Sequence, residues 1–459
     1  MDWRPDIGSG EGFIHQRILR ALEGDIASGH LSPDTRLPPH RTLSHRLGVG
    51  VGAVTQAYAQ AEARGLIVAH VGRGSFVAGP RVHASPEAVQ PGLIDLARNT
   101  APSVLAATHL VSALAALRRR PDLTAQLAYP PPAGLPSHRR AAAAWLSATV
   151  AWPRIDPERI ICTGGAQQAI AAALGAACRP GAAVVVEAAT FSGINTLAAH
   201  MDYRLIGAEM DAQGLTPEGL DRAARDGGAR VAYVQPLHNP TGRIMGAQRR
   251  RDIVAVARAR DLVLVEDDLY GVYAAELALA PLASLAPERV FYVSGLSKSL
   301  TPGLRAGYLI APDDVASHDR ALNVLRAVAF GAPGVAGLIG VQWIEDGTAH
   351  AILSSHKTEL AARTRSALDI LPSAERPANQ AATHVWIALS EREAERVAAR
   401  AAMGGVEVTP PHASCVDGGD VSGLRLCLGA APNRAVLTDA LRVVARALDP
   451  GVSGGLDLV

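Results

Sequence analysis

The sequence predicts two folded parts, a winged helix-turn-helix at the N-terminus and a larger α/β domain after it. Three observations lead to this prediction. At 459 residues, the chain exceeds the size of one ordinary domain. Its first 79 residues show apolar residues at helical spacing, interrupted by glycines. From residue 94 onward, short apolar strands alternate with alanine-rich helices, which is typical of an α/β domain with a largely parallel sheet.

The predicted N-terminal part, residues 1–79, contains three helices and a hairpin. Apolar residues recur at helical spacing over Ile18–Ile26, and a short second helix ends at Gly48. A third helix is expected over about Val51–Ala63. Residues 66–79 predict two short strands around a Gly-Arg-Gly turn. Two helices joined by a tight glycine turn, followed by such a hairpin, form a winged helix-turn-helix.

Residues 80–93 are rich in proline and small residues and are expected to form a linker. The α/β domain is expected over residues 94–459. Its polar motifs directly follow apolar strands, and ligands of such sheets bind at the carboxyl ends of the strands. From roughly residue 340 to residue 450, a helical stretch and three short strands predict a smaller α+β subdomain.

Composition and charge exclude several classes of protein. A net charge of +1 argues against an overall polyanion binder, but residues 36–75 carry five arginines and one acidic residue, a bias that suits phosphate contacts. The four cysteines form no CxxC pair, so neither a disulfide framework nor a metal site is expected. The sequence shows no signal peptide and no membrane span, so a cytoplasmic protein without membrane partners is expected.

Lys298 is the residue that most needs explanation, because the chain contains only two lysines among its 44 basic residues. Lys357, the other, is expected on an exposed helix. A lone lysine is usually a surface charge, yet Lys298 follows an apolar strand in the stretch "SGLSK". Desolvation favours the neutral amine, which can condense with an aldehyde. Pyridoxal 5′-phosphate (PLP) is the aldehyde carrier that uses this chemistry.

A PLP site also needs a carboxylate for the pyridine nitrogen, donors for the phenolic oxygen, a flat face for the ring and a phosphate cradle. Each requirement has a candidate in a motif that follows a strand. The motifs are "TGGAQQ", "EAATF", "HNPTG", "EDDLY" and "SGLSK", and the candidates in them and nearby are Ala166, Gln167, Phe191, Asn239, Asp267, Tyr270, Ser297 and Arg305. For Phe191, simple core packing is the competing interpretation.

These motifs resemble those of the fold-type I PLP-dependent transferases of the aspartate aminotransferase class, over roughly residues 94–448. Together with the N-terminal segment, the whole chain resembles the MocR subfamily of GntR-type transcriptional regulators. In that family a winged helix-turn-helix is fused to an aminotransferase-like domain with large and small subdomains. The resemblance implies PLP as cofactor and a head-to-tail homodimer.

The resemblance also implies a role for each candidate. Lys298 would form the Schiff base, Asp267 would pair with the pyridine nitrogen, and Phe191 would stack on the ring. The phenolic oxygen would be held by Asn239 and Tyr270. The phosphate would be held by Ala166, Gln167, Ser297 and Arg305. One departure is Gly295, where the family often carries a serine or threonine for the phosphate.

Two further residues enter only through the resemblance. Tyr129 would reach the cofactor phosphate of the partner subunit. Arg425, in "LRLCLG", would grip the carboxylate of a substrate or effector, since a planar guanidinium binds a carboxylate in two places. A surface arginine on a strand is the competing interpretation of Arg425.

In the DNA-binding part, the resemblance implies that Arg36 and Arg41 contact DNA and that Arg73 in the wing approaches the minor groove. The helix over about Val51–Ala63 would enter the major groove. Its start, "GVGA", lacks the base-reading arginine common in the family. Base readout would then rest on Thr55 and Gln56. A weak or degraded DNA-binding module is the alternative.

The sequence therefore predicts a PLP-dependent transcriptional regulator that binds an operator in double-stranded DNA. Its aminotransferase-like domain would sense PLP, an amino compound or both through an aldimine on Lys298, with little or no transaminase turnover. The alternative is an active class I aminotransferase with a vestigial DNA-binding module. A regulator with a PLP-free sensor is a poor third hypothesis, because it leaves Lys298, Asp267 and Asn239 unexplained.

Overall fold

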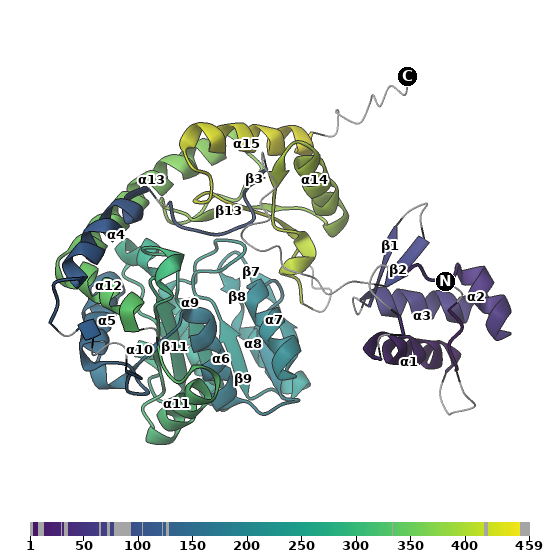
Figure 1. Cartoon of the computed structure of the whole chain (residues 1–459), viewed down its shortest axis with the longest axis horizontal. Helices are drawn as coiled ribbons and strands as arrows, with labels where there is room; N and C mark the ends of the chain where they lie inside the picture. The colour runs from purple at the N-terminus through teal and green to yellow at the C-terminus, as the bar shows by residue number, and fades with distance from the viewer. Residues whose placement is uncertain are drawn as a thin grey trace. The chain divides into compact units, whose positions relative to one another are not determined.

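The protein is described here from a computed structural model, which divides into two compact units, Met1–Pro91 and Gly92–Val459 (Figure 1). The structure describes residues 3–7, 13–28, 30–31, 35–63, 66–70, 74–77, 93–102, 104–121, 123–124, 128–332, 334–416 and 421–449. Of the predicted linker, only residue 93 belongs to the described part, so its conformation stays a prediction.

The N-terminal unit contains three helices and a two-stranded hairpin, as predicted. They are α1 (Ile14–Ala27), α2 (His40–Leu47), α3 (Val51–Ala63), β1 (Ile67–His70) and β2 (Gly74–Val77). The two strands are antiparallel, with Ile67 opposite Val77. A small apolar core holds the unit together; its fully buried members include Ile18, Leu22, Leu43, Val54 and Ala61.

The turn between α2 and α3 depends on Gly48. Its φ of +64° lies in the left-handed region, which glycine adopts without steric cost. The Ser44 hydroxyl donates a hydrogen bond to the Val49 carbonyl at 2.6 Å and fixes the exit from the turn. These contacts set the angle at which α3 leaves α2.

The second unit is built on a seven-stranded sheet in the order β4-β12-β11-β10-β9-β5-β6. The strands are β4 (Ile160–Thr163), β5 (Ala183–Glu187), β6 (Arg204–Ala208), β9 (Val231–Val234), β10 (Val263–Asp267), β11 (Val290–Gly295) and β12 (Gly307–Ile310). Five neighbouring strands, from β11 to β6, pair in parallel, while β12 is antiparallel to both of its neighbours. The largely parallel sheet predicted from the sequence is confirmed.

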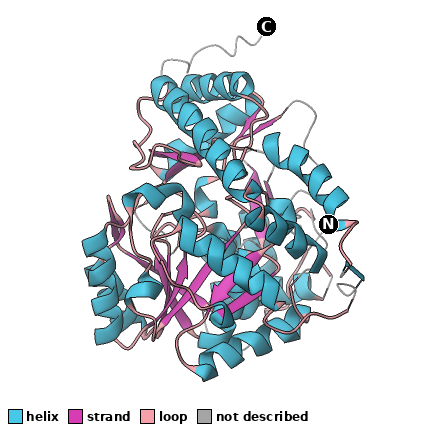
Figure 2. Ribbon diagram, turned by 90° about the vertical axis from the view of Figure 1, so that its left-hand side faces the viewer, coloured by secondary structure: helices cyan, strands magenta, loops and turns pink. Residues whose placement is uncertain are grey.

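Helices cover both faces of this sheet (Figure 2). Successive strand residues point to opposite faces, so Leu264 belongs to one apolar core and Val265 to the other. The first core is closed by α5 (Pro136–Thr149), α8 (Pro217–Gly227), α9 (Ala247–Ala259) and α12 (Gly334–Glu345). The second core is closed by α6 (Ala166–Ala177), α7 (Ser192–Met201) and α11 (Val315–Ala329).

Smaller elements complete this unit: α4 (Val104–Leu117), α10 (Leu282–Leu285), β7 (Met210–Asp211) and β8 (Gly214–Leu215). Within the described residues, no helix has the length and apolar character needed to span a membrane.

The small subdomain contains α13 (Thr348–Ile370), β13 (His384–Ala388), α14 (Glu391–Met403), β14 (Val406–Glu407), β15 (Gly423–Cys427) and α15 (Arg434–Leu448). The strands β13 and β15 pair antiparallel. A feature that the sequence did not predict is β3 (Ile94–Asp95), which pairs in parallel with β14. The first residues after the predicted linker are therefore bound to the small subdomain.

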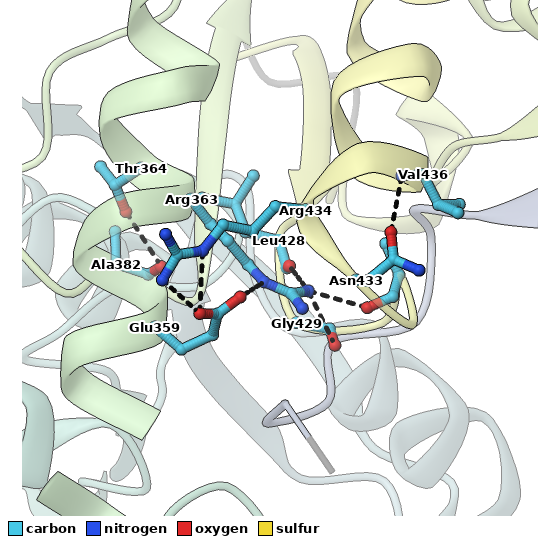
Figure 3. Close-up of polar contacts among 10 residues, drawn as sticks. Glu359, Arg363, Thr364, Ala382, Leu428, Gly429, Asn433, Arg434 and Val436 are labelled. Carbon is cyan, nitrogen blue, oxygen red and sulfur yellow. Dashed lines mark hydrogen bonds and ion pairs between the residues drawn. The ribbon is translucent and has the colours of Figure 1, made fainter. Parts of the chain in front are cut away.

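A buried arginine ties α13 to the segment between β15 and α15 (Figure 3). The side chain of Arg363 is 1% exposed, and its Nη1 donates to the carbonyls of Leu428 and Ala431 at 2.7 and 2.8 Å. Its Nε donates to Glu359 at 2.8 Å, and Glu359 also accepts from Arg434 at 2.6 Å. Because the guanidinium is buried and bonded, its loss leaves several acceptors without partners.

We expect Arg363→Met to lower the free energy of unfolding by about 2–4 kcal/mol, since it leaves the buried carbonyls of Leu428 and Ala431 without their donor. Thermal and urea unfolding followed by circular dichroism would measure the loss. Arg442→Met is the matched control, because the Arg442–Asp439 pair is exposed and should change stability by less than about 0.5 kcal/mol. Equal losses of unfolding free energy in both variants would contradict the stabilising role assigned to Arg363.

Candidate functional site

A cavity of about 130 Å³ is lined by residues from several strand ends and helix starts. Asp267 is the last residue of β10, and Lys298 follows β11 by three positions. Of the residues singled out in the sequence, nine line this cavity: Ala166, Gln167, Phe191, Asn239, Asp267, Tyr270, Ser297, Lys298 and Arg305. Ile170 and Leu269 complete its wall. The structure thus brings together residues that are widely separated in the sequence.

The amine of Lys298 lies in an environment that favours its neutral form. Burial lowers the pKa of Lys298 to about 8, and the Arg425 and Arg305 guanidinium groups act in the same direction, against the opposing effects of Cys427 and Asp267. The Nζ atom donates a hydrogen bond to the main-chain carbonyl of Asn99. Near neutral pH a useful fraction of the amine is therefore able to attack an aldehyde.

Asp267 is a buried carboxylate with fixed partners. The Tyr233 hydroxyl donates to its Oδ2 at 2.6 Å, and the Leu269 N–H donates to its Oδ1 at 3.2 Å. Burial raises the pKa of Asp267, while these two hydrogen bonds and the charge of Lys298 oppose that rise. The arrangement suits a carboxylate that pairs with a protonated ring nitrogen.

Asn239 is oriented by Arg425. Nη1 of Arg425 donates to the Asn239 Oδ1 at 2.7 Å, which leaves the Asn239 amide hydrogens to donate into the cavity. Nη2 of Arg425 donates to the Ala97 carbonyl at 2.7 Å and to the Thr409 hydroxyl at 2.8 Å. Arg425 is not among the lining residues of the cavity, and its buried Nε has no partner among the described residues. Its contact with an effector carboxylate stays a proposal.

The start of α6 forms an anion cradle. Gly165 caps the helix with a φ of +109°, and a Cβ there would lie 2.5 Å from Nη2 of Arg305. Only glycine therefore lets the guanidinium approach the helix N-terminus, where main-chain N–H groups and the helix dipole favour a phosphate. Arg305 is further held by a 3.0 Å hydrogen bond from its Nη2 to the Gly164 carbonyl.

Packing explains the departure at Gly295. A Cβ at this position would lie 2.8 Å from the Ala306 carbonyl oxygen and 3.1 Å from the Gly307 Cα, so no side chain fits between β11 and β12. The neighbouring hydroxyl of Ser294 is buried and is not among the lining residues of the cavity. Ser297 and Arg305 line the cavity and remain as the candidate phosphate donors on this side.

The ring of Phe191 lies beside the cavity at the start of α7. A Cβ at Gly193 would overlap the Phe191 ring and would lie 2.6 Å from the Gln167 Oε1. The Gln167 amide is held by a 2.8 Å hydrogen bond to the Gly193 carbonyl. Glycine at this position thus makes room for the aromatic face that the cavity presents.

Taken together, the donor set fits pyridoxal phosphate. A helix N-terminus and a guanidinium suit the phosphate, a buried carboxylate suits the ring nitrogen, and an amide and a phenol suit the ring oxygen. An amine with a lowered pKa completes the set. In the described part of the chain, no group of three or more His, Cys, Asp or Glu side chains is arranged to hold a metal ion.

Tyr129 does not lie in this cavity. Its side chain is 85% exposed and contacts Phe330, with the ring centroids 5.7 Å apart. Phe330 is itself exposed and has a φ of +57°, which is unusual for a residue with a side chain. The contact of Tyr129 with the phosphate of a partner subunit stays a proposal.

The candidate DNA interface lies on the N-terminal unit. Arg36, Arg41, Thr55 and Gln56 all have exposed side chains, while Arg73 lies outside the described residues. The Thr55 hydroxyl lies 3.1 Å from the His40 Nδ1, which links α3 to the start of α2. The first turn of α3 presents the exposed Val51 and open space at Gly52. This surface offers polar and small apolar groups where the family commonly offers an arginine.

Sequence reasoning missed two buried residues of the site, Tyr233 and Asn99. Tyr233 lies within β9, where an aromatic residue is ordinary for a strand, and only the tertiary structure reveals its contact with Asp267. Asn99 lies in the segment before α4 and contacts Lys298 and Tyr270 across 199 and 171 positions of sequence. No local pattern could have identified it.

Comparison with known families agrees with this architecture. Residues 91–444 match the family described as aminotransferase class I and II, and residues 14–77 match the bacterial regulatory proteins of the gntR family.

Among curated proteins, the HTH-type transcriptional regulator YdeF of Bacillus subtilis is 30% identical over 316 residues, covering 68% of each chain. The HTH-type pyridoxine biosynthesis transcriptional regulator PdxR of Corynebacterium glutamicum is 28% identical over 327 residues, covering 69% of each.

Among solved structures, the α-aminoadipate aminotransferase LysN of Thermus thermophilus has a TM-score of 0.69 at 23% identity. The match covers 80% of this chain and 95% of LysN. At this identity the likeness shows the fold of the second unit.

The lowered pKa of Lys298 predicts the pH dependence of cofactor uptake. With a pKa of about 8, the reactive neutral amine should rise from about one-tenth at pH 7 to about nine-tenths at pH 9. We therefore expect the rate of uptake of added PLP, measured by stopped-flow absorbance, to rise with pH and level off above pH 9. A Lys357→Ala variant should give the same profile. A rate that still climbs above pH 10 would indicate an ordinary lysine.

If Arg41 contacts a phosphate as predicted, Arg41→Ala should weaken DNA binding to any sequence and reduce the slope of log affinity against log salt by about one. Gln56→Ala should instead reduce discrimination between operator and unrelated DNA and leave the salt slope unchanged. Fluorescence anisotropy with both DNAs at several salt concentrations separates the two effects. Unchanged binding in both variants would favour a degraded module.

Proposed function

The chain belongs to the aminotransferase class I and II family and carries a gntR-family DNA-binding domain, which makes it a member of the MocR subfamily of transcriptional regulators. From this premise we propose that it is a cytoplasmic, PLP-dependent regulator whose large domain senses PLP, a small amino compound or both. The observation that carries the proposal is the cavity in which eight other predicted cofactor residues meet around Lys298.

When bound, PLP supplies an aldehyde that exchanges reversibly between the lysine amine and the amine of a small molecule. The residues of the chain provide the rest. Arg305 and the start of α6 would hold the phosphate, and Asp267 would keep a proton on the ring nitrogen. Asn239 and Tyr270 would donate to the ring oxygen. Release of the Lys298 amine by a competing amine would be the signal.

The effector would be an amine that also carries a carboxylate. Arg425 would supply the matching cation, but its present hydrogen bonds to Ala97 and Thr409 would have to give way to the carboxylate. Such an effector would bind differently to two arrangements of the domains, and that difference would shift their populations. PLP alone is the other candidate signal, and the pyridoxine-related name of PdxR supports it.

A head-to-tail homodimer would complete the assembly. Tyr129 is almost fully exposed, so in one chain its hydroxyl has no role in the cavity. In a dimer it would reach the phosphate held by the partner subunit. Two winged modules would then present their α3 helices to two half-sites of an operator.

An active aminotransferase with a vestigial DNA module is the second candidate function. The complete set of cofactor residues favours it, because Lys298, Asp267 and Asn239 suffice in principle for amine exchange. The two candidates differ in what amino acids do to the protein. A regulator should show slow or no conversion of the bound cofactor to its amine form, together with a change in DNA affinity.

We expect Lys298→Ala to abolish the absorbance of covalently held PLP and to remove any effect of PLP on DNA affinity. Basal DNA binding should remain, because the variant leaves the N-terminal unit unchanged. Absorbance spectra and fluorescence anisotropy on the upstream DNA of the protein's own gene, with and without PLP, measure both properties.

Lys357→Ala is the matched control and should behave like the wild type. Wild-type protein that takes up no PLP would refute the proposal. Rapid conversion by amino acids without any DNA binding at low salt would establish the enzyme instead.

A further inference from the structure

Asn99 occupies an unusual place between the two subdomains. It follows β3, whose pairing with β14 anchors it to the small subdomain; the Leu96 N–H donates to the Glu407 carbonyl at 2.8 Å. Its side chain is only 7% exposed. Asn99 nevertheless contacts two residues of the cofactor cavity, so its position depends on both subdomains.

The side-chain amide of Asn99 donates to Tyr270. Its Nδ2 lies 3.0 Å from the Tyr270 hydroxyl oxygen and 3.0 Å from the Nδ1 of His384 on β13. The main-chain carbonyl of Asn99 accepts a hydrogen bond from the Lys298 amine. One residue therefore bonds both to the amine that would bind the cofactor and to the phenol that would face its ring oxygen.

The tautomer of His384 decides which way the Asn99 amide points. Burial lowers the pKa of His384 to about 3, so the imidazole is neutral in the physiological range. The edge of its ring contacts Tyr270, with the ring centroids 5.8 Å apart. In the tautomer with its proton on Nε2, the imidazole would accept at Nδ1 from the Asn99 NH₂ group and from the Thr383 hydroxyl, which lies 3.0 Å away. In that tautomer the amide of Asn99 is held as a donor to Tyr270 by a group on another element.

This arrangement decides where the Tyr270 proton goes. Burial raises the pKa of Tyr270, so the phenol keeps its proton in the physiological range. Because the phenol oxygen already accepts from Asn99, its own O–H is free to donate elsewhere. Tyr270 lines the cavity, and a hydrogen bond received by a hydroxyl strengthens the one that it donates.

We propose that Asn99 is a positioning residue of the cofactor site, which holds Tyr270 as a hydrogen-bond donor to the ring oxygen of PLP. The proposal rests on the proposed function, since it requires that PLP binds this cavity. The main-chain carbonyl of Asn99 also accepts a hydrogen bond from the Lys298 amine.

Substitution of Asn99 should raise the pH at which the absorbance of bound PLP titrates. Loss of a donor to the ring oxygen leaves its negative charge less stabilised, so the neighbouring Lys298 nitrogen keeps its proton to higher pH. The other charged or titratable groups around Tyr270 and Lys298 are unchanged by substitution of Asn99; they are Asp267, Tyr273, Arg305, His384, Arg425 and Cys427.

The test is a pH titration of the absorbance of bound PLP in the full-length protein. We expect Asn99→Ala to raise the midpoint by about 0.5 to 1 pH unit, the size of one hydrogen bond. Tyr270→Phe should raise the midpoint at least as far. In a Tyr270→Phe background, Asn99→Ala should add no further shift, because the two act in one chain of contacts.

Asn379→Ala is the matched control. Asn379 is buried to a similar degree and donates to the Tyr273 and Ala381 carbonyls, without a contact to Tyr270 or Lys298. It should lower the thermal midpoint and leave the pH midpoint unchanged, as a purely structural residue would. Should Asn99→Ala fail to fold, Asn99→Ser, which keeps a short polar side chain, takes its place.

An unchanged pH midpoint in the Asn99→Ala variant would overturn the proposal. The proposal would also be overturned if Asn99→Ala shifted the midpoint as far in the Tyr270→Phe background as it does in the wild type. Both results leave the proposed function intact, provided that wild-type protein binds PLP. If the wild type shows no PLP absorbance, the proposed function fails first, and the two failures are distinguishable.

Discussion

The parallel pairing of β10 with β11 is the constraint on which the rest of the site depends. It sets Asp267 opposite Val293, so the carboxylate at the end of β10 lies at the same sheet edge as the loop that carries Lys298. Parallel strands align their carboxyl ends, and the connecting helices keep that edge open. A carboxylate and an amine with a lowered pKa can then face one small molecule in a shared cavity.

The stretch that follows the predicted linker connects the small subdomain to the residues of the predicted cofactor and effector sites. Its β3 pairs with β14 of the small subdomain, the Ala97 carbonyl accepts from Arg425, and the Asn99 carbonyl accepts from Lys298. The two cations of the predicted cofactor and effector sites are therefore bonded to one short backbone segment. Any ligand that replaced those carbonyls would change the contacts of this segment.

The contacts that Arg425 makes in the structure differ from the carboxylate contact that the sequence predicts for it. Its residue type suits a carboxylate, but its terminal nitrogens bond to Asn239, Ala97 and Thr409. The guanidinium orients the Asn239 amide. A carboxylate would have to compete with the other two acceptors, the Ala97 carbonyl and the Thr409 hydroxyl. A charged carboxylate forms the stronger hydrogen bonds to a guanidinium, so the exchange is chemically reasonable.

The sequence by itself predicted the helices and hairpin of the N-terminal unit, the largely parallel sheet and nine candidate cofactor residues that line one cavity. These features depend on periodicity, on glycine turns such as Gly48 and on motifs at strand ends, all of which are local. Only the tertiary structure decided the antiparallel β12, the pairing of β3 with β14 and the contacts of Tyr233 and Asn99. Those features join segments far apart in the chain, and their energy comes from burial and hydrogen bonding that no local pattern records.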